Sequence, residues 1–452
     1  MKGYNPVMRK KKLNKVLKIA IFAFSALALM VGLYFVPPIH DRLHWRLLNI
    51  WADIYYFFNP IGGSAFSPGQ QAQMEEIVNQ TLTALAITPT ETIEPSSTPT
   101  NFVTFTSTPS PSPTPTSTPL PESFLLEGVK YEKETFNNCG PASLSMLLSF
   151  WGWNGNQAIT GEWLKPNWQD RNVMPYEMLD YVQSETNLKG LIRYGGDLEI
   201  LKTFIANGFP ILIERGFEDE VPQDEWMGHY GVLTAYNDAE RYFLIQDAYV
   251  GPDYARSYDY IERFWPSFQN IYLILYPPNR EAEVLSILGP HADPTYNLEV
   301  ASQKALEATG EAEGRDSFFA WYSYGTSLYL LNDYFEAARA YDRAFEIKNQ
   351  LWPDNPADQI NENDPWRITW YQTGPYFAYY YTNRFQDVID LANETFKDSI
   401  VDAIEESWVW RGRAKVRLGD VEGAIEDFRK ALEWHPGWWV AEEELRLLGV
   451  EP

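Results

Sequence analysis

The chain has a single cysteine, Cys139, which lies in the stretch FNNCGPASLSML (136–147). A cysteine attacks as the thiolate, so a catalytic cysteine needs a group that stabilises the negative sulfur and a base that takes its proton. Because Pro141 follows closely and proline is favoured in the first helical turn, we expect Cys139 at the start of a helix. The free N–H groups and the dipole of such a helix stabilise a negative sulfur. These residue types predict a nucleophile, with a small apolar structural residue as the alternative.

The base is expected to be a histidine, and the chain has five. His40 and His44 lie beside an apolar N-terminal segment, and His291 and His435 lie in or near a helical C-terminal part. His229, in GHYGVLTAYN (228–237), is the histidine that shares a domain with the cysteine. We therefore predict His229 as the general base.

A third side chain should orient the imidazole ring, and Asp247 is the candidate. It lies in a predicted strand, RYFLIQDAYV (241–250), which follows the strand of His229 after a turn. A three-residue loop would place Asp247 and His229 on one face, whereas a two-residue loop would place them on opposite faces. The residues alone do not choose between these registers, so Gln246 and Asp238 stay as alternatives.

Three motifs, NNCGPASLSML, GHYGVLTAYN and LIQDAYVG, resemble those of papain-like cysteine peptidases of the bacteriocin-processing, double-glycine leader type. The resemblance covers Phe124 to Pro278. It implies a papain-like fold in which Cys139 is the nucleophile, His229 acts as general base and then as acid, and Asp247 orients the ring. It also implies that a peptide bond is cleaved through an acyl-enzyme.

The sequence departs from this family pattern at one position. The family has a glutamine five or six residues before the cysteine, where its amide helps to bind the oxyanion, but this chain has Lys133 and Glu134 there. Losing one oxyanion donor typically costs about 10²–10³ in rate. Three substitutes are open: a protonated Glu134, the amide of Asn137 or Asn138, or the backbone N–H of Cys139 acting with Lys133. Without any of them, the cleft would bind peptides and not cleave them.

The elements that position these residues are predicted in a domain at 122–278. A helix is expected at CGPASLSMLLSFWG (139–152), and strands are expected at 208–217, 230–237, 241–250 and 271–276. A helix followed by several strands indicates an α+β domain.

A helical domain at 297–450 follows and contains internal repeats. The segments beginning at Trp321 and Trp408 have small and large residues at the same spacings and resemble tetratricopeptide repeats, which recruit protein partners. A degenerate copy lies between them, from about Trp366 to Phe396, and a capping helix is expected from Trp438 to Leu448. We predict an all-α solenoid.

The N-terminal part predicts a membrane anchor. Residues 1–18 form a tail with seven Lys or Arg, and the apolar segment 19–36 is about long enough to cross a bilayer. A membrane-proximal segment, 37–87, and a Thr/Pro/Ser-rich linker, 88–121, follow. By the positive-inside tendency we expect a single-pass protein with a cytoplasmic N-terminus and an extracytoplasmic bulk. A cleaved signal peptide and a buried helix are the alternatives.

Composition narrows the function further. The chain has 452 residues and a formal net charge of −25, which argues against binding to nucleic acid. No cluster of Cys and His, no metal-ligand spacing and no phosphate-binding glycine motif stands out, so we expect neither a metal nor another cofactor. The combined prediction is a membrane-anchored, extracytoplasmic cysteine peptidase with a partner-recruiting repeat domain. A non-catalytic peptide-binding scaffold and a papain-like amidase are the alternatives.

Overall fold

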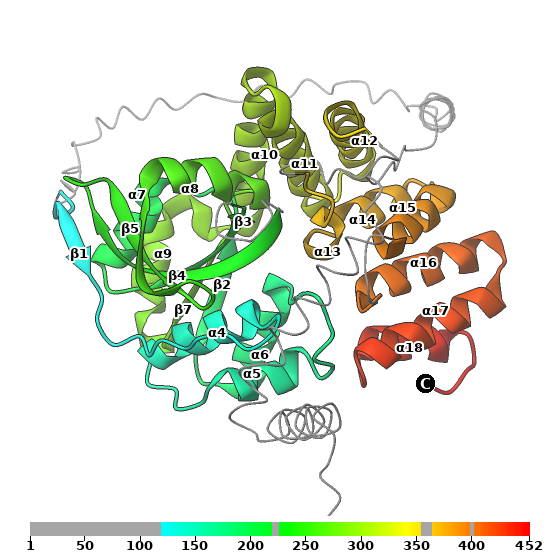
Figure 1. Cartoon of the computed structure of the whole chain (residues 1–452), viewed down its shortest axis with the longest axis horizontal. Helices are drawn as coiled ribbons and strands as arrows, with labels where there is room; N and C mark the ends of the chain where they lie inside the picture. The colour runs from blue at the N-terminus through cyan, green and yellow to red at the C-terminus, as the bar shows by residue number, and fades with distance from the viewer. Residues whose placement is uncertain (1–118, 219–225, 354–363, 398–401) are drawn as a thin grey trace, which may run out of the picture. The chain divides into compact units, whose positions relative to one another are not determined.

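The computed structural model describes residues 119–218, 226–353, 364–397 and 402–452 (Figure 1). The predicted basic tail, transmembrane helix and membrane-proximal segment, with nearly all of the linker, lie outside the described residues. Within those four ranges, no helix combines the length and the apolar character that crossing a bilayer requires.

The first part of the described chain is built on an antiparallel sheet. Its strands run in the order β2-β7-β3-β4-β5-β6, and β1 also pairs with β4. Their bounds are β1 Ser123–Leu125, β2 Lys189–Arg193, β3 Ile211–Phe217, β4 Met227–Asn237, β5 Tyr242–Asp247, β6 Gly251–Ser257 and β7 Tyr272–Tyr276. The sequence patterns indicated β3, β4, β5 and β7 but missed β1, β2 and β6. Strand β1 has three residues, and β2 and β6 form the edges of the main sheet and are partly exposed, so none of the three has a continuous apolar signal.

Helices cover both faces of the sheet because alternate side chains of a strand point in opposite directions. Ile211 and Ile213 of β3 pack with residues of α7, α8 and α9, whereas Leu212 packs with residues of α4 and α6. The helices and short 3₁₀ turns are α4 Cys139–Phe150, α5 Gln157–Leu164, α6 Pro175–Glu185, α7 Leu198–Ala206, α8 Tyr258–Phe264, η2 Trp265–Phe268, η3 Pro278–Arg280, α9 Glu281–Leu288 and η4 Gly289–Ala292.

The helix of the cysteine was therefore predicted, but several others were missed. One of them, α7, carries a readable start signal: Asp197 is its N-cap and accepts a hydrogen bond from the backbone N–H of Ile200.

The hairpin of β4 and β5 differs from both predicted registers. Asn237 pairs with Tyr242 across a four-residue turn, and a β-bulge between Leu233 and Ala235 then shifts the pairing by one residue. Beyond the bulge, Val232 pairs with Gln246. The three-residue and two-residue loops considered from the sequence are both wrong, because a bulge adds an unpaired residue that side-chain alternation does not reveal.

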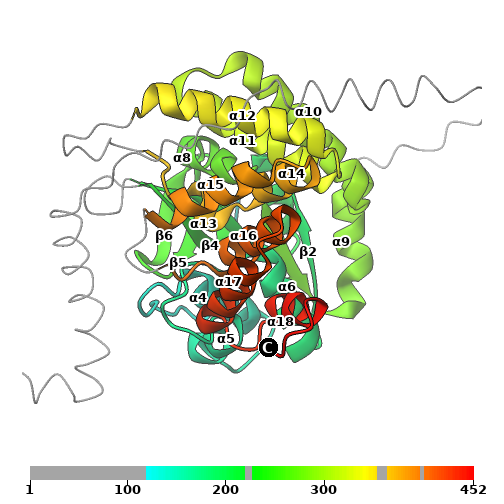
Figure 2. The ribbon, with the colours of Figure 1, turned by 90° about the vertical axis from the view of Figure 1, so that its right-hand side faces the viewer.

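The second part of the described chain is a series of helices, α10 to α18 (Figure 2). Their bounds are α10 Pro294–Glu311, α11 Gly314–Leu330, α12 Tyr334–Leu351, α13 Ile368–Tyr371, α14 Gly374–Tyr381, α15 Phe385–Lys397, α16 Glu405–Leu418, α17 Val421–Trp434 and α18 Trp439–Leu447. The two clear repeats correspond to α11–α12 and α16–α17, and the degenerate copy corresponds to α14–α15. In the clear repeats, the glycine of the first helix lies against an aromatic ring of the second, Gly325 against Tyr341 and Gly412 against Phe428.

The sheet domain and the helices share one hydrophobic core. Trp226 stacks on Phe268 with ring centroids 5.8 Å apart, and its ring also lies 5.8 Å from those of Phe319 in α11 and Tyr371 in α13. Trp226, Phe268 and Phe319 belong to a buried cluster that continues through the first repeats, and the partly buried Tyr371 packs against it. The helices therefore pack directly on the domain that carries the predicted catalytic residues.

Candidate active site

Cys139 is the first residue of α4, as the sequence predicted. The residue before it, Asn138, accepts the backbone N–H of Ala142 with its carbonyl and so begins the helix. The rest of α4 is buried from Gly140 to Ser149, whereas Cys139 itself is only half-buried. A rigid, packed helix therefore presents the sulfur at its N-terminus, where the helix dipole favours negative charge.

His229 and Asp247 lie side by side. The His229 Nε2 atom is 2.9 Å from the Asp247 Oδ1 atom, and both side chains are buried. The β-bulge creates this contact. With the pairing seen beyond it, Gly231 would stand opposite Asp247, and His229, two residues further along β4, keeps the same face. Without the bulge, the two side chains would point to opposite faces.

The Asp247 carboxylate is held by further donors. Arg215 on β3 donates from Nη2 to Asp247 Oδ2 at 2.8 Å, and both side chains are 0% exposed. The backbone N–H groups of Tyr249 and Val250 each donate to Oδ1 at 3.0 Å. Burial acts to raise the pKa of Asp247, but His229, Arg215 and the backbone N–H groups outweigh it and hold the pKa well below its usual range. Asp247 is therefore a carboxylate at any physiological pH.

The pKa of His229 is raised, whereas that of Asp247 is lowered. Burial would lower the pKa of the imidazole, but Asp247 and then Cys139 raise that pKa to about 10. The ring stacks on Phe217, with centroids 4.3 Å apart. Since Nε2 faces Asp247, Nδ1 is left as the ring nitrogen that can exchange a proton with Cys139 Sγ. The site therefore favours the protonated form of His229.

Glu134 lies beside Cys139 and His229. A carboxylate oxygen of Glu134, the Cys139 sulfur and a ring nitrogen of His229 all lie within 4.8 Å of one another. Its backbone N–H donates to the carbonyl of Ala248 at 2.9 Å, which fixes the segment next to the end of β5. Its Oε2 atom is buried and has no hydrogen-bond partner among the described residues. Burial, the largest influence, raises the pKa of Glu134 to about 7, although His229 acts to lower it.

The side chains of the two asparagine candidates for the oxyanion site are engaged elsewhere. The Asn137 side-chain amide donates to the carbonyl of Asp170, and the Asn138 amide donates to Gln157 Oε1 at 3.0 Å. Asn137 has a φ of 53°, a conformation that asparagine tolerates better than most residues. Both asparagines thus shape the loop before Cys139, and Glu134 is the candidate side chain that lies at the sulfur.

The fallback partners for His229 lie away from it. The Gln246 amide donates to Thr234 Oγ1 at 3.0 Å and to Asp253 Oδ1 at 2.7 Å. Asp238 is in the turn of the hairpin, where it pairs with Lys202. Neither residue contacts the imidazole, so Asp247 is the residue that the structure brings to His229.

Sequence reasoning missed three residues at this site. Arg215 holds Asp247, and Phe217 stacks on His229. The position of Arg215 within the otherwise mostly apolar run ILIERGF was a signal that could have found it. Tyr371 belongs to the helical part and packs on Gly228, where a Cβ would lie 2.9 Å from its ring. No local pattern indicated that contact, because it joins segments more than a hundred residues apart.

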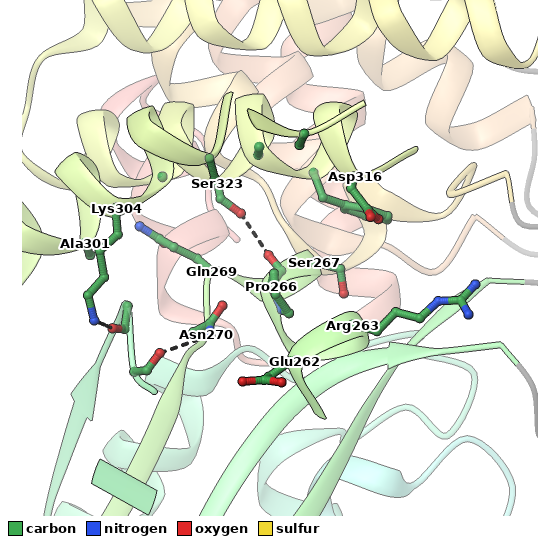
Figure 3. A pocket seen from close by; sticks show the side chains of 17 residues that line it. Glu262, Arg263, Pro266, Ser267, Gln269, Asn270, Ala301, Lys304, Asp316 and Ser323 are labelled. Carbon is green, nitrogen blue, oxygen red and sulfur yellow. Dashed lines mark hydrogen bonds between the residues drawn. The ribbon is translucent and has the colours of Figure 1, made fainter. Parts of the chain in front are cut away.

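A cavity of about 320 Å³ lies elsewhere, between the loop around Gly195, the η2 turn and helices α10 and α11 (Figure 3). Alanines of α10 line it together with Gln269, Asn270 and Ser323. Ser323 donates to the carbonyl of Pro266 at 3.0 Å and thereby joins α11 to η2. None of the predicted catalytic residues lines this cavity, so it is separate from the thiol site.

Comparison with known proteins assigns two regions. Residues 126–276 match the model of the Peptidase_C39 like family, and residues 405–437 match a model of the tetratricopeptide repeat. A solved structure, described as a putative C39-like peptidase from Bacillus anthracis, aligns with 15% identity and a TM-score of 0.28 and covers 34% of this chain and 97% of that one. No match was found among curated proteins.

Proposed function

We propose that the Peptidase_C39-like domain at residues 126–276 is a cysteine peptidase in which Cys139, His229 and Asp247 act together. The observation that carries this proposal is the 2.9 Å contact between Asp247 and His229, with the Cys139 sulfur beside the same ring at a helix N-terminus. This arrangement supplies a nucleophile, a proton carrier and a group that fixes the orientation of the carrier.

In the proposed reaction, the Cys139 thiolate attacks the carbonyl carbon of the scissile peptide bond. The C–N bond then breaks as His229 gives its Nδ1 proton to the leaving amine, and an acyl-enzyme remains on the sulfur. Water attacks the acyl carbon while His229 takes a proton from it. The C–S bond breaks, which releases the carboxylic acid and restores the thiolate and imidazolium.

The oxyanion requires donors near the sulfur, and we assign them to the backbone N–H of Cys139 and to protonated Glu134. The pKa of Glu134, raised by burial to about 7, keeps the carboxyl group neutral in mildly acidic solution. A neutral carboxyl group donates a hydrogen bond, as the family's glutamine amide would. When Glu134 ionises, its charge repels the oxyanion, so cleavage slows while the cleft can still bind peptides. This second state corresponds to a peptide-binding scaffold.

The repeat domain is proposed to recruit a protein partner or substrate. The match of residues 405–437 to the tetratricopeptide repeat supports this role. We also propose that residues 19–36 anchor the chain in a membrane, with the described domains on the extracytoplasmic side. Extraction of cell membranes with alkaline carbonate tests the anchor: the full chain should stay in the pellet, and its recovery in the supernatant would reject the anchor.

The catalytic proposal is tested by labelling the thiol, since the chain has one cysteine and the modified residue is therefore known. We would measure the rate of alkylation of Cys139 by iodoacetamide at about pH 6.5 in the full chain, the His229→Ala variant and the control His291→Ala. Loss of the imidazolium partner should slow alkylation by about tenfold or more, because the thiolate is the reactive form. The control should react like the unchanged chain.

A peptide-library digest with the Cys139→Ala variant as the blank then identifies cleaved bonds. Equal alkylation rates in the unchanged chain and His229→Ala would show a structural cysteine and reject the peptidase. Fast alkylation without any cleavage would favour the peptide-binding scaffold.

A further inference from the structure

Four buried carboxylates and one imidazole gather where the sheet domain meets the last repeat. Asp170 precedes α6, Glu177 lies in the first turn of α6, Glu405 and Glu406 begin α16, and His435 follows α17. One carboxylate oxygen each of Asp170 and Glu405 and a ring nitrogen of His435 lie within 4.8 Å of one another. The same holds for one carboxylate oxygen each of Glu177, Glu405 and Glu406. Glu405 belongs to both groups and therefore stands at the centre of the cluster.

Such a concentration of acid is costly without a compensating positive charge. Burial, and then the neighbouring Glu405, raise the pKa of Glu177 to about 8 and move the pKa of Asp170 and Glu406 upward as well. Two basic side chains face these four acids: His435 Nδ1 lies 3.0 Å from Glu405 Oε1, and the buried Lys165 acts to lower the pKa of Asp170.

Two oxygens of the cluster are left without any hydrogen bond. Asp170 Oδ2 and Glu405 Oε2 are buried and have no partner among the described residues, and their side chains are only 1% and 2% exposed. The other oxygen of each group is used: Asp170 Oδ1 accepts from the backbone N–H of Asn172 at 3.1 Å, and Glu405 Oε1 faces His435. Buried carboxylate oxygens of a folded protein nearly always have a donor or a cation, so these two indicate a ligand.

We propose that this cluster binds a divalent transition-metal ion of the Mn²⁺ or Zn²⁺ class. Carboxylate oxygens attract hard divalent cations, and the imidazole nitrogen favours Mn²⁺ or Zn²⁺ over Mg²⁺ and Ca²⁺, which prefer ligand sets made of oxygen alone. Asp170, Glu405 and His435 form one group of ligands, and Glu177 and Glu406 supply further oxygens near Glu405. A bound ion removes the repulsion among the carboxylates.

The ion would join two parts of the chain. Asp170 and Glu177 come from the sheet domain, whereas Glu405, Glu406 and His435 belong to the repeat matched at 405–437. Other contacts already join these parts: the backbone N–H of Arg171 donates to the carbonyl of Ala403 at 3.2 Å, and the Asn167 amide donates to the carbonyl of Glu433 at 3.2 Å. The metal would therefore fasten the last repeat to the sheet domain. The sequence predicted no metal centre because these ligands come from three separate segments, none of which has ligand spacing by itself.

The test is a calorimetric titration of the full chain, purified in detergent and stripped of metal with a chelator, with Mn²⁺, Zn²⁺, Ca²⁺ and Mg²⁺. The titrations are done in a Cys139→Ser background, so that the active-site thiol and His229 do not bind zinc. We expect saturable binding of Mn²⁺ or Zn²⁺, at least about tenfold tighter than that of Ca²⁺ and Mg²⁺. Saturation should raise the thermal midpoint by about 5 °C, because the ion binds the folded chain.

Two variants test the assigned ligands. Glu405→Gln removes the residue shared by both groups and His435→Gln removes the imidazole, and each should weaken binding by at least about tenfold. Glu433→Gln and His291→Gln change the same residue types outside the cluster and should bind like the parent chain. Circular dichroism checks that each variant is folded. The proposal is overturned if no ion binds saturably to the parent, or if both ligand variants bind as tightly as the controls.

Discussion

The group most tightly held at the candidate site is Asp247, not the cysteine. Its carboxylate oxygens accept a hydrogen bond from Arg215 at 2.8 Å and from two backbone N–H groups at 3.0 Å each. One of these oxygens also lies 2.9 Å from the His229 ring nitrogen Nε2. Removal of one partner from a buried ion pair leaves the other charge without compensation, which costs more than the pair itself contributes. Arg215 thus has a structural role on which the orientation of His229 depends.

We predict that Arg215→Met destabilises the fold by about 3 kcal/mol, since it leaves the buried Asp247 with one donor fewer. Arg241→Met is the matched control, because Arg241 pairs with Asp259 at 3.0 Å on the surface. Its loss should cost much less, because an exposed ion pair is screened by solvent. Urea unfolding followed by tryptophan fluorescence measures both. Similar costs for the two variants would mean that the buried pair contributes nothing beyond a surface pair.

Glu134 should make the reaction dependent on pH. Burial raises the pKa of this carboxyl group to about 7, so it is a neutral donor below that pH and an anion above it. We therefore expect kcat/KM on a peptide from the library screen to fall as the pH rises through about 7. The glutamine in Glu134→Gln cannot ionise, so kcat/KM of this variant should not fall above about pH 7. At pH 8.5 its kcat/KM should exceed that of the parent by about tenfold.

The exposed Glu162→Gln on α5 is the control for the Glu134 variant and should keep the pH profile of the parent. If Glu134→Gln shows the same fall in kcat/KM as the parent, another group is responsible for that limb.

At the scale of elements, small residues decide how closely the repeat helices approach each other. A Cβ at Gly412 in α16 would lie 2.6 Å from Phe428 Cε1 in α17. Gly325 and Tyr341 repeat this contact in the first pair, where the corresponding distance is 2.9 Å. Each pair therefore depends on a glycine that leaves room for an aromatic ring.

We predict that Gly412→Ala destabilises the fold by about 1–3 kcal/mol, because its methyl group overlaps the Phe428 ring. Gly310→Ala is the control, since a Cβ there has no neighbour within 4 Å. Alanine in place of an unconstrained helical glycine should stabilise the chain by about 0.5–1 kcal/mol. Thermal unfolding of the two variants should therefore move in opposite directions. A stabilising effect at both positions would refute the close packing inferred at Gly412.

At the scale of the whole molecule, the helices and the sheet domain form a joint core, and the acidic cluster adds a second contact between them. Trp226 and Phe268 from the sheet domain pack with Phe319 and Tyr371 from the helices. Because Tyr371 also packs on Gly228, next to His229, the repeats contribute to the surroundings of the candidate site.

The acidic cluster should make the metal-free protein sensitive to pH. Burial, then Glu405, raise the pKa of Glu177 to about 8, while the backbone N–H of Met174 acts in the opposite direction and Asp180 adds to the rise. The folded chain therefore keeps a proton that the unfolded chain loses above its own pKa, near 4.3, so stability falls as the pH rises from about 4.3 to 8.

We expect the thermal midpoint in the presence of a chelator to fall by several degrees over that range. Glu177→Gln should flatten the dependence, and the control Glu185→Gln, an exposed residue at the end of α6, should not. A midpoint with the same pH dependence in both variants would show that Glu177 does not hold the extra proton.

The sequence by itself indicated which residue types could do chemistry. Cys139 lies at a helix start because Pro141 suits a first turn, and His229 and Asp247 were recognised from their residue types and their order. The paired helices of the repeats follow from small and large residues at fixed spacing. All of these features depend on local preferences, which act over a few residues and are therefore readable along the chain.

Only the tertiary structure decided which side chains meet. The bulge between Leu233 and Ala235 places Asp247 on the face of His229, and neither register read from the sequence included it. Arg215 at Asp247, Tyr371 beside Gly228 and the cluster around Glu405 join segments that are far apart in the chain. Such contacts depend on how strands pair and how domains pack, and those free energies are sums over many distant residues that no local pattern records.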